Sequence, residues 1–165
     1  METASAAALL TANPRSFPPE QYLAAFSRCL SSCYSSAIED ILLQSDASKQ
    51  YALNVNAQDL IHQEPALAYL LLHDPQLVSP LLDEALMTVQ QQMQTFMGTG
   101  TSAQTSVKAN AHVRIECLPY TAGGDLWKPT ISNLRNTDLG QMIRVRADRK
   151  YRLLLLVVLL YADEI

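Results

Sequence analysis

Three features that would settle the class of a protein at once are missing from this sequence. Its three cysteines, Cys29, Cys33 and Cys117, are odd in number and show no framework spacing, which favours free thiols in a reducing compartment over a disulfide scaffold. The apolar run from Leu153 to Tyr161 has nine residues, whereas a membrane-spanning helix needs about 20. The N-terminal stretch has no basic start and only a very short apolar segment, so it does not fit a signal peptide.

Patterns for catalysis and metal binding are missing as well. No Ser/His/Asp or Cys/His set has a local signature, and the phosphate-binding pattern G-x-x-x-x-G-K-[ST] does not occur. Cys29 and Cys33 stand one helical turn apart and could form half of a metal site. No second pair lies nearby, so two small buried residues are the better interpretation. We therefore expect no catalytic residue, no metal site and no cofactor in this chain.

Apolar residues are what the sequence has in quantity. They make up 48% of the 165 residues and charged residues 17%, so the chain can bury a core and is not a disordered polymer. The net charge of −4 is uneven, because residues 1–110 carry four Lys/Arg against ten Asp/Glu and residues 111–165 carry eight against six. Phosphate binding needs clustered cations, so any nucleic-acid contact is expected from the C-terminal third.

Helical spacing dominates the first hundred residues. A helix is predicted from about Pro19 to Gln44, Asn56 is predicted to cap a second, and a third follows Pro65. A fourth is predicted to begin at Pro80, behind the capping residue Ser79, and to end near residue 97. The predicted buried stripes are Leu23, Phe26, Leu30, Cys33, Ala37 and Ile41 in the first helix, and Leu82, Leu86, Val89, Met93 and Phe96 in the last.

Extended segments interrupt and follow this helical region. In HVRIECLP, which starts at His112, apolar residues and Cys117 alternate with charged residues, which is the period of a half-buried strand, and Pro119 ends it. The other predictions are a short strand at Tyr51–Val55, a turn of helix near Ile131–Asn136, a strand at Gln141–Arg146, and either a buried strand or a short helix in the Leu153–Tyr161 run.

The order of these elements resembles the N-terminal region of the minichromosome maintenance (MCM) helicases, in which a helical subdomain precedes an oligonucleotide-binding (OB) β-barrel. VRIECLP resembles the first strand of that barrel, and LRNTDLGQMIRV resembles the segment that leads into its next strand. LNVNAQDLIHQEPALAYLLLHDPQLVSPLLDEAL resembles the family's strand, helix and P…L…LD.AL helix. The resemblance covers roughly residues 20–146, and among family members it is closest to the paralogue associated with recombination repair.

This resemblance implies a mainly α fold class: a bundle of about four helices followed by the first strands of an incomplete OB-type barrel. The expected parts are a disordered tail at 1–18, the helical bundle at 19–97, a linker at 98–110, and a partial OB-fold with a divergent apolar tail at 111–165. After IRVR the family continues with Gly-Thr-Val, whereas here Ala147 and Asp148 follow. The family's zinc-binding cysteines, nucleotide-binding loop and arginine finger lie further on, so a truncated or alternative product of a helicase gene is expected.

Five cations gather within nine residues: Arg144, Arg146, Arg149, Lys150 and Arg152. A barrel of this kind implies that they contact the DNA backbone. The alternative is a solvated strand face with gatekeeper charges ahead of an aggregation-prone run. Arg144, Arg146, Arg149 and Lys150 are the DNA-binding candidates.

Two functions are compatible with these features. The first is an N-terminal fragment of an MCM-type DNA helicase, acting in replication or repair in the nucleus without its own ATPase motor. Its expected partners are other MCM-family subunits and DNA, bound weakly and non-specifically, and no membrane. The alternative is a non-enzymatic helical module for protein–protein interaction, which would stay monomeric until a specific partner is added.

The missing phosphate-binding loop generates a direct prediction. The purified chain should show no ATPase activity and no ATP binding above background, because nothing in it can hold the phosphates and magnesium. Isothermal titration calorimetry with ATP and Mg²⁺ measures this. Saturable binding would contradict the assignment of a chain without a motor.

Overall fold

Five helices make up most of the described part of the chain. The structure is a computed structural model that describes residues 18–97, 105–118, 127–128, 130–146 and 153–157. The predicted disordered tail, 1–18, lies outside these ranges apart from Pro18. The helices are α2 (Pro19–Cys33), α3 (Ser35–Leu42), α4 (Ala57–Gln63), α5 (Pro65–His73) and α6 (Pro75–Met97).

A break at Tyr34 divides the first predicted helix in two, so the single helix from Pro19 to Gln44 was wrong. The Tyr34 hydroxyl donates a hydrogen bond to Asp59 Oδ2 at 2.6 Å and accepts one from the backbone N–H of Asn56 at 2.8 Å. The break changes which residues are buried next to it. Phe26, Leu30 and Ile41 are buried as predicted, but Cys33 and Ala37 are exposed, and α3 buries Ile38 in place of Ala37.

The later helices begin at prolines or at a capped residue. Asn56 caps α4 as predicted, since its side chain accepts a hydrogen bond from the N–H of Gln58 at 2.9 Å. The predicted start at Pro80 was wrong, because α6 begins at Pro75 and contains Pro80. Pro80 is the sixth residue of α6, where proline removes one backbone hydrogen bond and its ring crowds the carbonyl four residues earlier. Ser79 Oγ donates to the Pro75 carbonyl at 2.7 Å instead of capping.

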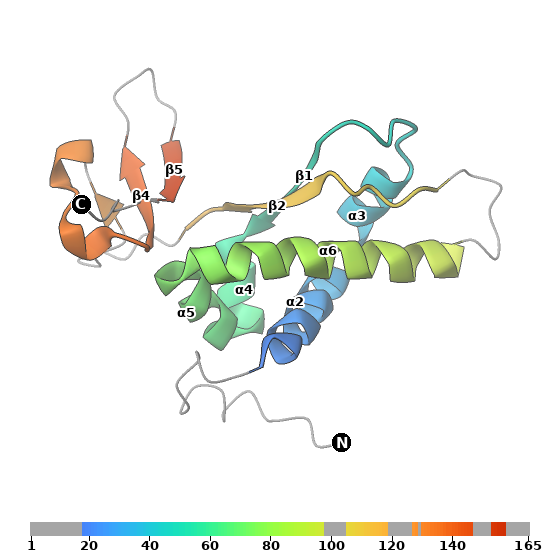
Figure 1. The fold of residues 1–165 in the computed structure, drawn as a ribbon, viewed down its shortest axis with the longest axis horizontal. Helices are drawn as coiled ribbons and strands as arrows, with labels where there is room; N and C mark the ends of the chain where they lie inside the picture. Colours follow the sequence, from blue (N-terminus) through green and yellow to red (C-terminus); the bar gives the residue numbers. More distant parts are fainter. Residues whose placement is uncertain (1–17, 98–104, 119–126, 129, 147–152, 158–165) are drawn as a thin grey trace, which may run out of the picture.

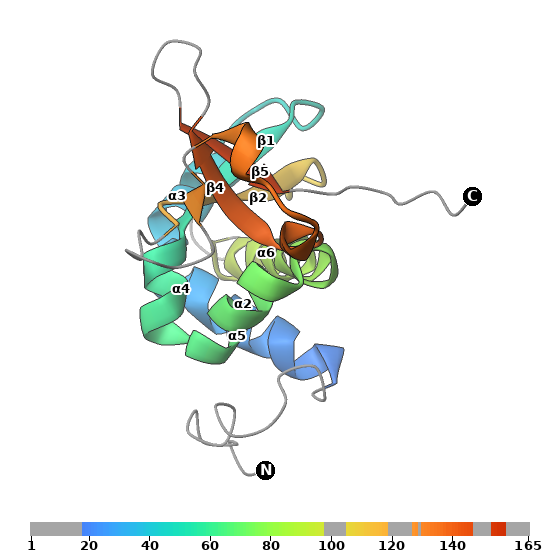
Figure 2. The same cartoon turned by 90° about the vertical axis from the view of Figure 1, so that its left-hand side faces the viewer.

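Helix α6 is the element around which the others are arranged. Figures 1 and 2 show it lying between α2 on one side and the strands β1 (Tyr51–Asn56) and β2 (Ala111–Glu116) on the other. Leu82, Leu86 and Val89 are buried as predicted, and Met93 is partly buried. Phe96, also predicted as buried, is 82% exposed near the end of the helix.

Strands β1 and β2 pair in parallel along their whole length, from Tyr51 with Ala111 to Asn56 with Glu116. A carboxylate of α6 holds the pair in place: Asp83 Oδ1 accepts a hydrogen bond from the N–H of Val113 at 2.8 Å, and its Oδ2 lies 3.0 Å from His112 Nδ1. The alternation predicted for β2 is confirmed up to residue 116. Cys117 is exposed and has a positive φ of 54°, so the alternation ends there.

Residues 105–110, the described half of the predicted linker, lie against α6. The amide of Gln90 accepts a hydrogen bond from the N–H of Lys108 at 2.9 Å, and Gln94 Nε2 donates to the Thr105 carbonyl at 2.8 Å. Both Gln90 and Lys108 are fully buried, and Lys108 Nζ donates to Ser106 Oγ. The division of the chain at residues 98 and 111 stays a prediction, but the chain returns to the bundle before β2 begins.

A second, three-stranded sheet lies beyond the ends of α5 and α6 (Figure 1). Its order is β3 (Trp127–Lys128), β4 (Met142–Arg146) and β5 (Leu153–Val157), with β3–β4 parallel and β4–β5 antiparallel. The strand predicted from Gln141 is thus β4, and the apolar run contains a strand. Two short 3₁₀ turns, Ile131–Asn133 and Asn136–Asp138, replace the predicted turn of helix.

The predicted fold class is confirmed: the described chain is mainly α, with one strand between α3 and α4 and the other strands after α6. In the part of the chain that the structure describes, the predicted count of about four helices becomes five, because Tyr34 divides the first. Within the described ranges the strands form two small open sheets and no closed barrel.

The core position of Leu86 predicts a large cost for truncation. Leu86 is fully buried in the main core cluster, so Leu86→Ala should lower the free energy of unfolding by roughly 2–5 kcal/mol through lost contacts and a cavity. Leu77, on the same helix and 46% exposed, is the matched control. Urea unfolding midpoints that move equally for the two variants would show that Leu86 is not in the core.

Candidate nucleic-acid interface

The four predicted DNA-binding cations lie in β4 and directly after it. Arg144 and Arg146 belong to β4, the middle strand of the three-stranded sheet. The side chain of Arg144 is described, whereas that of Arg146 is not. Arg149 and Lys150 lie outside the described residues. The structure therefore brings Arg144 and Arg146 onto one strand and leaves the other two candidates as predictions.

Arg144 is partly engaged inside the protein. Its Nη1 donates a hydrogen bond to the backbone carbonyl of Leu118 at 3.2 Å, and its Nε is buried without a hydrogen-bond partner. The side chain is half-buried. This contact joins β4 to the residue that follows the end of β2. An arginine held in this way keeps its charge near the surface but has fewer free donors for a phosphate, so a DNA contact by Arg144 stays a prediction.

Three neighbours of Arg144 in β4 are buried. Met142, Ile143 and Val145 are all at most 3% exposed. Met142 packs with the bundle core, while Ile143 and Val145 pack with Leu134 in a separate small cluster. The face of β4 that carries Ile143 and Val145 is therefore covered, whereas Arg144 on the opposite face stays half-buried.

A buried ion pair next to the strand was missed by the sequence analysis. Lys128 Nζ lies 2.8 Å from Asp138 Oδ1, and both side chains are largely buried. Burial by itself would raise the pKa of the Asp138 carboxyl, but the hydrogen bonds from Lys128 and from the Arg135 N–H outweigh it and hold the pKa below its usual value. The positive charge of Lys128 is thus neutralised inside the protein. No local pattern indicated this pair, because ten positions separate Lys128 from Asp138 in the sequence.

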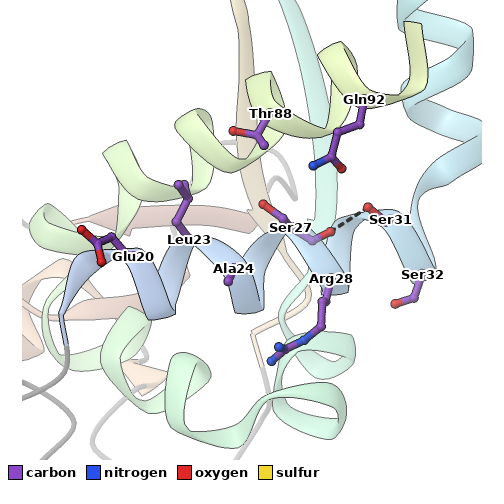
Figure 3. A pocket seen from close by; sticks show the side chains of 9 residues that line it. All are labelled: Glu20, Leu23, Ala24, Ser27, Arg28, Ser31, Ser32, Thr88 and Gln92. Carbon is purple, nitrogen blue, oxygen red and sulfur yellow. Dashed lines mark hydrogen bonds between the residues drawn. The ribbon is translucent and has the colours of Figure 1, made fainter. Parts of the chain in front are cut away.

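A shallow groove of about 740 Å³ lies between α2 and α6 (Figure 3). Its lining consists of Glu20, Leu23, Ala24, Ser27, Arg28, Ser31 and Ser32 from α2, and Thr88 and Gln92 from α6. Ser31 Oγ donates to the Ser27 carbonyl, and Arg28 points away from α6 and pairs with Glu64 at 2.9 Å. The groove holds no pair of titratable groups set for acid–base chemistry.

The cysteines that the structure describes differ in their burial. Burial is the main reason why the pKa of the Cys29 thiol rises to about 12, so this thiol stays protonated at neutral pH. Cys33 is exposed at the end of α2. In the described ranges no three His, Cys, Asp or Glu side chains gather as metal ligands would. None of the helices described there has the length and apolarity needed to cross a membrane.

Comparisons with known proteins identify one matching family profile and a similar solved structure. The family profile described as "MCM9, N-terminal domain" matches residues 19–119. Among solved structures, the 1.8 Å crystal structure of the N-terminal domain of an archaeal MCM is similar, with a TM-score of 0.53 and 17% sequence identity. The match covers 78% of this chain and 46% of that chain, so this chain spans less than half of that length. A search of curated protein sequences finds no match.

The internal contact of Arg144 predicts a structural effect that another surface arginine would not have. Arg144→Gln should lower the free energy of unfolding by about 1–3 kcal/mol, because the Leu118 carbonyl loses its donor. Arg114→Gln, on the exposed face of β2, is the control and should change it by no more than about 0.5 kcal/mol. Chemical denaturation of both variants decides this. Equal stabilities would mean that the Arg144 guanidinium is free in solution.

Proposed function

Because this chain belongs to the MCM family, as an N-terminal region near the MCM9 branch, we propose that it serves as the non-enzymatic N-terminal module of an MCM-type DNA helicase. In this proposal it acts in the nucleus, in DNA replication or repair. It takes part in assembling a hexameric ring with other MCM-family subunits and contributes weak, non-specific contacts to DNA.

One observation carries the proposal: the family match extends from residue 19, at the start of α2, to residue 119, just beyond the end of β2. It therefore includes the whole helical bundle and the strand that returns to it. The match does not include an ATPase motor, and the 165 residues contain no phosphate-binding loop. ATP hydrolysis would have to come from a motor region of the family type, and this chain would supply part of the collar.

Assembly with related subunits is tested by mixing. The chain and the N-terminal region of a second MCM-family subunit are combined, and size-exclusion chromatography with light scattering measures the mass of the product. Co-elution as a mixed oligomer is expected. A chain that ignores family subunits and stays monomeric until an unrelated protein is added would favour the alternative, a helical protein–protein interaction module.

DNA contact generates a prediction for the four candidate cations. Replacing Arg144, Arg146, Arg149 and Lys150 with Gln should remove most of the affinity for a single-stranded oligonucleotide. It should also flatten the dependence of affinity on salt, by about one unit of slope for each cation that contacts a phosphate. Fluorescence anisotropy at several salt concentrations measures both quantities.

The control replaces two cations of the acidic N-terminal part, Arg15 and Arg28. It should change neither the affinity for the oligonucleotide nor the dependence of that affinity on salt. Arg28 already pairs with Glu64, which supports its use as a control. If the fourfold variant keeps both its affinity and its slope, the four residues are gatekeepers for the apolar run and do not contact DNA.

A further inference from the structure

The groove between α2 and α6 has the length and the lining that a further helix needs. Its α2 side spans residues 20–32, which is about 18 Å along a helix axis. That side carries the small residues Ala24, Ser27 and Ser31, together with the half-buried Leu23 (Figure 3). Helices pack by fitting side-chain ridges into grooves, and small side chains let the two axes approach closely.

The hydroxyl groups along the groove are already engaged as hydrogen-bond donors. Ser31 Oγ donates to the Ser27 carbonyl at 2.8 Å, and Thr88 Oγ1 donates to the Glu84 carbonyl at 3.0 Å. Ser32 Oγ donates to another carbonyl of α2 at 3.1 Å. Because each of these donors is satisfied within its own helix, an apolar surface can cover the groove without leaving them unpaired.

One end of the groove is acidic. Glu20 lines it at the start of α2, and Figure 3 shows that Thr88 is nearer to this end than Gln92. Glu84 is exposed and stands one helical turn before Thr88, so it lies towards the same end. Within the described part of the chain, neither Glu20 nor Glu84 forms an ion pair. A ligand with cations at this end would therefore find two available carboxylates.

We propose that this groove binds a basic amphipathic helix of a partner protein, in the helix-in-groove mode of peptide recognition. The bound helix is about 12 residues long, to match the groove. It has small or apolar side chains on its buried face and Lys or Arg near its C-terminal end. The inference goes beyond the proposed function, since it needs neither DNA nor an MCM-family subunit.

The acidic end also sets the direction of the bound helix. Its basic C-terminal end lies beside Glu20 and Glu84, so it runs antiparallel to α2. In this direction the negative end of its dipole meets the positive end of the α2 dipole, and its own cations stand where a helix favours them. The opposite direction would bring two positive helix ends together.

Charge selects this occupant over the other candidates. A nucleic acid or an anionic membrane would be repelled, because residues 1–110 carry ten Asp/Glu against four Lys/Arg. Two copies of the chain that met groove to groove would offer each other no free cation from the lining. Arg28 is the cation there, and it already pairs with Glu64 at 2.9 Å and points away from α6.

Selection from a peptide library identifies what the groove of the full chain prefers. The phage-displayed peptides have about 15 residues in an alanine-rich helical frame, since shorter isolated helices are marginal, with random residues on one face and at both ends. The enriched peptides should combine a small or apolar face with Lys or Arg at the C-terminal end. Fluorescence anisotropy then measures the affinity of an enriched peptide for the chain and its variants.

Filling the groove tests where the peptide binds. Ala24→Trp and Ser31→Trp place a large side chain at exposed positions of the lining, and each should weaken binding at least about tenfold by steric exclusion. Gln21→Trp makes the same kind of change at an exposed position of α2 outside the lining and should leave the affinity unchanged. Circular dichroism confirms that each variant keeps its helices.

Reversing the acidic end tests the electrostatic part. Glu20→Lys with Glu84→Lys should weaken binding about tenfold, since two exposed ion pairs are replaced by repulsion. Glu39→Lys with Asp40→Lys makes the same charge change at exposed positions of α3 and should have no effect. A version of the peptide with its cations moved to the N-terminal end should bind more weakly to the wild type.

Several results would overturn the proposal. They are a selection without enrichment, enriched peptides that are acidic or carry their cations at the N-terminal end, and unchanged binding to both tryptophan variants of the lining. Dimers of the wild type that Ala24→Trp dissociates would assign the groove to a second copy. Displacement of the enriched peptide by a synthetic peptide of residues 1–17 would assign it to the chain's own N-terminal segment. None of these results depends on whether the chain assembles with MCM-family subunits.

Discussion

The parallel pairing of β1 with β2 is the interaction on which the rest of the structure depends. It joins segments about 60 positions apart in the sequence, in a register of six consecutive pairs. A two-stranded ladder is marginal by itself, so it needs support from another element. Helix α6 gives that support through Asp83, which binds the N–H of Val113, and through Gln90, which binds Lys108 just ahead of β2.

This ladder sets where the second sheet can lie. The buried Leu118 follows the end of β2, and its carbonyl accepts the hydrogen bond from Arg144 in β4. Met142, two residues before Arg144, packs into the same core as the bundle. The predicted DNA-binding cations of β4 are therefore attached to the bundle by a short series of contacts. A change that opens the β1–β2 ladder is expected to move them as well.

Local patterns in the sequence were enough to predict the helices, the cap at Asn56 and the strands β2 and β4. They failed where a distant partner decides the local structure. The break at Tyr34 depends on Asp59, which is 25 residues away, and serine-rich neighbours on both sides gave no local sign of it. Pro80 has the sequence features of a helix start, yet the helix begins one turn earlier because tertiary packing outweighs the loss of one hydrogen bond.

The candidate site was less predictable than the fold. The cluster of cations is visible in the sequence, but the hydrogen bond of Arg144 to Leu118 and the pairing of Lys128 with Asp138 depend on contacts between distant segments. Periodicity placed residues on faces of β4 but could not show that Met142, Ile143 and Val145 are all buried. Family resemblance supplied the order of elements, and it gave no information on the run that follows Arg146, where the sequence departs from the family.

Native-state hydrogen exchange tests the central claim, that the β1–β2 ladder and the bundle form one cooperative unit, most directly. The amides of β1 and β2 should exchange through the same opening as those of α6, with the same free energy and the same dependence on denaturant. The account would be contradicted if the β2 amides exchanged through a local opening of lower free energy while the α6 amides stayed protected. Residues from 111 onwards would then be a separate unit.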